Sequence, residues 1–102
     1  MPTTTDNELR VMLSAVYSAQ FLAAHAVSGE ELDAVRDHAR RALAAALAML
    51  DDADTPDARG MVAACREFAE RVAEFVERPT PSRCLAVREK AERIRAACRV
   101  SW

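Results

Sequence analysis

The chain has 102 residues, a hydrophobic fraction of 51% and a net charge of −2 at neutral pH. A chain of this length forms one domain with one modest core. The small negative charge argues against strong general attraction to nucleic acids or acidic membranes, so we expect neither as a partner. Two glycines and four prolines interrupt an alanine-rich sequence that has no long β-branched runs, which predicts an all-α fold.

Apolar spacing and capping residues divide residues 1–102 into four predicted helices of a single domain. These helices cover about residues 5–27, 29–50, 55–77 and 81–100. Short joints force neighbouring helices to run in opposite directions, which predicts an antiparallel up-down-up-down four-helix bundle. The alternative arrangement is a three-helix core whose first helix is exchanged with a partner chain.

The first predicted helix has no Asp, Glu, Lys or Arg from Val11 through Gly29. Its outward face therefore lacks the charged side chains that a surface helix of a soluble monomer normally carries. We predict that this face forms a contact with a second copy in a homodimer, or with another protein. The predicted interface consists of Val11, Ser14, Ser18, Phe21, Leu22 and His25.

Two other interpretations account for the same uncharged helix. A membrane span needs about 20 mainly apolar residues, whereas Ser14, Gln20 and His25 interrupt this run. A central helix enclosed by its own neighbours would also need no charge. The amino terminus has no basic segment ahead of an apolar stretch, so we expect no secretory signal and a cytoplasmic location.

The second helix has a well-marked start and a regular apolar face. Ser28 with Glu31 three residues later predicts a capping box, and Gly29 is expected to relieve the tight turn. Thr55 followed by Pro56 predicts the start of the third helix. The predicted inward residues of the second helix are Leu32, Val35, Ala39, Ala42, Leu43, Ala46 and Leu50.

The segment 38–42 resembles the motif of histidine phosphotransfer domains. Those domains are four-helix bundles with an exposed histidine, a lysine three residues later and a glycine four residues later. In this chain Arg41 stands at the lysine position and Ala42 at the glycine position. The resemblance implies that His38 accepts a phosphoryl group that Arg41 helps to hold. The alternative is a histidine at the edge of a solvated helix face.

The third and fourth helices each carry a heptad-like apolar seam, the pattern of helices that pack at a shallow angle. One seam consists of Met61, Cys65, Phe68, Val72 and Phe75, and the other of Cys84, Val87, Ala91, Ile94 and Cys98. Folding the two helices back on each other places Cys98 about one turn from Cys65. We expect reduced, buried cysteines, with a disulfide as the alternative.

The carboxyl-terminal segment is locally basic, with six Arg or Lys and two Glu from Ser82 onward. Arg88 with Glu92 and Glu89 with Arg93 are spaced for ion pairs one turn apart. No aromatic residue alternates with these cations, so we expect this surface to face an acidic protein or a second subunit. Trp102 has two equally open interpretations, an apolar lid or a free end.

The motifs of metal, haem and catalytic sites are missing from the sequence. Neither His25 nor His38 follows a Glu by three residues, as in di-iron bundles, and no Cys-x-x-Cys-His is present. We therefore expect no catalytic residue, no metal and no cofactor. The sequence predicts a non-catalytic interaction or regulatory module. The alternatives are phosphotransfer through His38 and a bundle that holds a small molecule beside residues 44–46.

Overall fold

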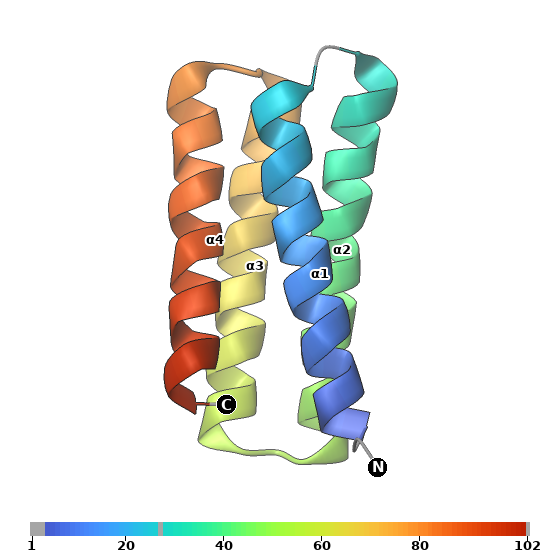
Figure 1. The fold of residues 1–102 in the computed structure, drawn as a ribbon, viewed down its shortest axis with the longest axis vertical. Coiled ribbons are helices and arrows are strands. Elements are labelled where there is room, and N and C mark those ends of the chain that lie inside the picture. The colour runs from blue at the N-terminus through green and yellow to red at the C-terminus, as the bar shows by residue number, and fades with distance from the viewer. Residues whose placement is uncertain (1–3, 27, 102) are drawn as a thin grey trace.

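A computed structural model describes the backbone of residues 4–26 and 28–101, with side chains for residues 6–26 and 28–98. It contains four helices, α1 (Thr4–His25), α2 (Gly29–Asp52), α3 (Pro56–Glu77) and α4 (Pro81–Ser101), and the described residues form no strand. The connections alternate between the two ends of the molecule, so successive helices run in opposite directions (Figure 1). The predicted all-α four-helix bundle is confirmed.

The helix starts follow the capping signals in the sequence. The Ser28 hydroxyl oxygen accepts a hydrogen bond from the Glu31 backbone N–H at 3.2 Å and donates to Glu31 Oε1 at 3.1 Å. Thr55 Oγ1 accepts from the Ala58 N–H at 3.1 Å, directly ahead of Pro56 in the first turn of α3. Each hydroxyl satisfies a donor that has no partner within the helix.

The expected role of Gly29 is wrong. Gly29 is the first residue of α2, and no described residue has a positive φ, so the turn uses no conformation that favours glycine. A Cβ at Gly29 would meet no atom within 4 Å. The Ser28 cap therefore suffices to start the helix.

Three helix ends differ slightly from their predicted positions. Helix α2 runs to Asp52 rather than to about Leu50, because the Ala53 N–H donates to the Met49 carbonyl at 3.0 Å and extends the last turn. Helix α1 ends at His25, and the predicted end at Val27 lies outside the described residues. Helix α4 continues one residue beyond its expected end, to Ser101, and Trp102 also lies outside the described residues.

The core confirms the two predicted seams. All five seam residues of α3 are buried, and so are four of the five in α4, whereas Cys84 is half-buried. Helix α2 buries Ala45 in addition to the alanines predicted for it, and α1 buries Ala15 and Ala19. Alanine side chains let two helix backbones approach closely, and α1 packs more closely on α2 than on α4.

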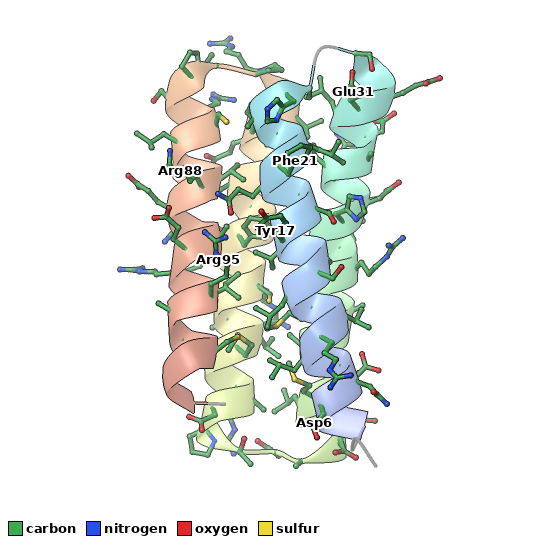
Figure 2. The ribbon with its side chains drawn as sticks, viewed as in Figure 1. Asp6, Tyr17, Phe21, Glu31, Arg88 and Arg95 are labelled. Carbon is green, nitrogen blue, oxygen red and sulfur yellow. The ribbon has the colours of Figure 1, made fainter. Side chains whose placement is uncertain are left out.

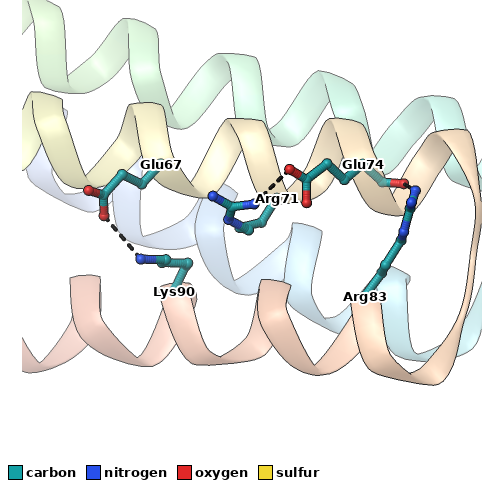
Figure 3. A network of polar contacts seen from close by, with 5 residues as sticks. All are labelled: Glu67, Arg71, Glu74, Arg83 and Lys90. Atoms are coloured by element: carbon teal, nitrogen blue, oxygen red, sulfur yellow. Dashed lines mark hydrogen bonds and ion pairs between the residues drawn. The ribbon is translucent and has the colours of Figure 1, made fainter.

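Polar contacts join α3 and α4 along their exposed edge (Figure 3). Lys90 Nζ lies 3.2 Å from Glu67 Oε2, and Arg83 Nη1 donates to the Glu74 backbone carbonyl at 2.5 Å. Arg71 Nη1 binds the Glu74 carboxylate at 2.6 Å. Part of the basic charge of α4 is thus used in contacts with α3.

None of the described helices combines the length and apolarity needed to cross a membrane.

Candidate functional site

Helix α1 presents an aromatic strip to solvent. We use this name for Tyr17, Phe21 and His25, which lie one turn apart along one side of the helix. Tyr17 is 59% exposed and Phe21 is 57% exposed, although both are large and mainly apolar. The strip lies on the part of the chain that contains no charged residue from Val11 to Gly29. The strip is therefore an aromatic surface in contact with water, and the neighbouring residues in the sequence are uncharged.

The carboxyl-terminal half of this strip is held in place by contacts within the helix. The Phe21 and His25 rings are stacked, with centroids 4.6 Å apart and an angle of 30° between their planes. His25 Nδ1 lies 2.8 Å from the Phe21 carbonyl oxygen. A carbonyl oxygen only accepts hydrogen bonds, so Nδ1 is the donor and the imidazole orientation is fixed. The Phe21 ring therefore needs little further ordering on binding.

A groove runs beside the strip, between α1 and α4. It consists of a cleft of about 340 Å³ and a second of about 490 Å³, which share Ala24, Cys84 and Arg88 in their walls. Tyr17, Phe21 and His25 line the first cleft, and Leu85 on α4, which is 53% exposed, lines the second. We call this surface the α1–α4 groove. Figure 2 shows Tyr17 and Phe21 on α1 and Arg88 and Arg95 on the neighbouring α4.

The polar groups of the α1–α4 groove are unevenly paired. Arg88 forms the predicted ion pair with Glu92, with 3.3 Å between Nε and Oε1. The Arg95 guanidinium lies over the Tyr17 ring, 5.9 Å from its centroid, within range of a cation–π interaction. Gln20 Oε1 is buried without a hydrogen-bond partner in the described part of the chain. The groove is therefore an aromatic and apolar surface with arginines along one edge.

A separate cleft of about 400 Å³ lies on the other side of α1, against α2. The cleft contains both residues that the phosphotransfer motif singled out, His38 and Arg41. His38 is half-buried, and its Nδ1 is buried without a hydrogen-bond partner among the described residues. The lining residues of this α1–α2 cleft are Arg10, Val11, Ser14, Ala15, Ser18, His38 and Arg41.

The structure divides the predicted interface between these two surfaces. Val11, Ser14 and Ser18 line the α1–α2 cleft, whereas Phe21 and His25 line the α1–α4 groove. Leu22 is half-buried and packs against the core. Sequence reasoning omitted Tyr17, Leu85 and Arg95. The position of Tyr17, one turn before Phe21, was the available signal.

The cysteines are free thiols with different environments. Burial raises the pKa of Cys65 to about 12, and the nearby Cys98 thiolate would raise it further by repulsion. Burial also raises the pKa of Cys98, to about 11. Cys84 is half-buried in the groove, and its Sγ donates to the Ala23 carbonyl at 3.7 Å. Cys65 and Cys98 thus act as small apolar core residues, and Cys84 is the accessible thiol.

Known proteins provide no assignment for these surfaces. Among the described residues, no group of three or more His, Cys, Asp and Glu side chains is placed to hold a metal ion. Comparisons of the chain with protein-family models, curated proteins and solved structures find no match.

Proposed function

We propose that this protein is a small interaction module that forms a homodimer through the aromatic strip on α1. The exposure of Tyr17 and Phe21, both above half, is the observation that carries the proposal. Aromatic side chains contribute a large share of the binding energy in protein interfaces. An exposed aromatic surface of this kind on a small helical protein favours a binding role.

A second copy of the chain is the partner that the charges favour. The strip has no charged residue next to it in sequence, so two copies can bring these stretches of α1 together without repulsion between charges on α1 itself. In a symmetric contact the same surface is used twice, which requires such self-complementarity. The arginines of α4 would then lie at the rim, where arginine is common in interfaces. Tyr17 and Phe21 would occupy the dry centre.

The cysteines favour a reducing compartment for this module, such as the cytoplasm. Cys65, Cys84 and Cys98 are all free thiols, and free thiols persist where the cell keeps them reduced. Their use as core and groove residues gives them no need of a disulfide. The proposed role is therefore that of an intracellular binding protein without its own catalysis.

Replacing Phe21 by serine is expected to weaken the dimer by about 30-fold, which corresponds to about 2 kcal/mol per dimer, or about 1 kcal/mol from each of the two copies. Sedimentation equilibrium over a range of protein concentrations measures the dissociation constant. Phe21 is not part of the buried core, so the helices of the variant are expected to remain formed. Circular dichroism of the same samples checks this.

The matched control is Leu47→Ser. Leu47 is 40% exposed, lies on α2 and lines none of the three clefts. This variant is expected to dimerise as the natural chain does. A natural chain that stays monomeric up to about 1 mM would exclude the homodimer. Equal weakening by both variants would show that the contact uses a different face.

A further inference from the structure

The α1–α2 cleft gathers polar side chains from two neighbouring helices. Arg10, Ser14 and Ser18 follow one another at intervals of four residues and therefore lie one turn apart along α1. His38 and Arg41 are three residues apart and lie on one face of α2. All five line the same space of about 400 Å³. The antiparallel packing of α1 and α2 thus brings two guanidinium groups, two hydroxyls and an imidazole together.

None of these five side chains has a partner within the described part of the chain. No hydrogen bond or ion pair joins Arg10, Ser14, Ser18, His38 or Arg41 to another described residue, and His38 Nδ1 is buried without a partner. The neighbouring arginines of α2 behave differently. Arg36 lies 4.0 Å from Asp33, and Arg40 lies 3.7 Å from Asp37, both on the outer surface. The side chains of the cleft are therefore available to hydrogen-bond a ligand, and among their described polar atoms only His38 Nδ1 is buried without a partner.

The chemistry of the cleft selects an anion. No Asp or Glu among the described residues lines it, so these walls do not neutralise the positive charge of Arg10 and Arg41. Guanidinium groups bind oxyanions through paired hydrogen bonds, and serine hydroxyls and an imidazole N–H add further donors. A buried polar atom without a partner costs free energy, which a ligand that hydrogen-bonds to His38 would recover.

We infer that the α1–α2 cleft binds the phosphate group of a small phosphorylated molecule. A phosphate dianion offers several acceptor oxygens in different directions, which suits donors that approach from both helices. The volume of about 400 Å³ falls within the range of small-molecule sites, so there is room for a small group attached to the phosphate. Val11 and Ala15 provide an apolar wall for that group.

Inorganic phosphate is the probe for this site, titrated into the isotope-labelled protein and followed by NMR. Phosphate is expected to shift the backbone amide signals of Ser14, Ser18, His38 and Arg41 in a saturable manner, whereas chloride at equal ionic strength does not. Replacing Arg41 by glutamine is expected to weaken phosphate binding by about tenfold or more, because a charge-assisted hydrogen bond is lost. Methyl phosphate is expected to bind at least as well, since it keeps three terminal phosphate oxygens and the double negative charge.

Arg40→Gln is the matched control, because it removes the same charge from the adjacent residue on the outer surface. This variant is expected to bind phosphate as the natural chain does. Equal weakening by the two variants would overturn the site in favour of general charge attraction, as would a titration without saturation. Binding to vesicles that contain phosphatidic acid, without binding of phosphate or methyl phosphate, would assign the cleft to a lipid surface and overturn the small-molecule ligand. Among the described residues, the cleft shares no lining residue with the α1–α4 groove, so failure of the dimer proposal does not affect this one.

Discussion

Replacing Phe68 by alanine is expected to lower the free energy of unfolding by about 3–5 kcal/mol. Phe68 lies at the middle of the α3 seam and is completely buried. It is the largest of the fully buried side chains in the described part of the chain. Its removal would take apolar contacts from the core and leave a cavity that rigid neighbouring helices cannot fill. Small domains are stable by only about 5–15 kcal/mol, so this loss is a large part of the total. Denaturation by urea, followed by circular dichroism, measures it.

Phe21→Ala provides the control for this prediction, because it is the same chemical change at an exposed position of α1. At a protein concentration where the chain is monomeric, we expect a change of about 0.5 kcal/mol or less. A small effect of Phe68→Ala, similar to that of Phe21→Ala, would contradict the packing of α3 described above.

Cys65 is expected to react with alkylating reagents much more slowly than an ordinary thiol at about pH 8, because its thiolate fraction is lower by about a thousandfold. The thiolate is the reactive form, and a rise in pKa from 9.0 to about 12 reduces the thiolate fraction accordingly. Cys84, half-buried in the groove, is expected to react first. Mass spectrometry of partly alkylated protein gives the rate at each cysteine.

Unfolding in guanidinium chloride is expected to make all three thiols react at similar rates. The Cys84→Ala variant is expected to lack the fast reaction of the native protein.

The raised pKa of Cys65 also makes the stability of the protein depend on pH. Between pH 9 and about 12 the Cys65 thiol of the unfolded chain ionises while the native thiol stays protonated, so the unfolded state binds fewer protons. The free energy of unfolding should therefore fall as the pH rises through this range, by at most about 1.4 kcal/mol per pH unit for Cys65. Rapid native alkylation of Cys65 would contradict its burial.

The fold was largely predictable because local signals and apolar spacing agree. Ser28 and Thr55 mark helix starts through their own hydroxyls, and Phe68 and Ile94 lie on seams whose spacing places them inward. The small residues were harder to assign. Ala15 and Ala19 lie between faces of α1, and alanine is compatible with either core or surface, so only the packing of α2 decides their burial.

The candidate surfaces were predictable only in part. The absence of charged residues from Val11 to Gly29 indicated an exposed apolar face on α1. The positions of α2 and α4 determine which residues of that face line the α1–α2 cleft and which line the α1–α4 groove. Ser14 and Ser18 lie beside α2, while Phe21 lies beside α4, and helical spacing alone did not separate them. The contact of Arg95 with Tyr17 joins residues far apart in sequence, so no local pattern could reveal it.

The rate of Cys84 alkylation, measured at protein concentrations below and above the range of dimerisation, tests the proposed interface most directly. Cys84 lines the α1–α4 groove together with Tyr17 and Phe21, so a second copy that covers the aromatic strip should restrict access to its sulfur. The homodimer proposal predicts that the rate constant, at a fixed excess of reagent, falls as the dimer forms. A rate constant that stays the same while sedimentation shows a dimer would contradict it, because the two copies would then meet through another face.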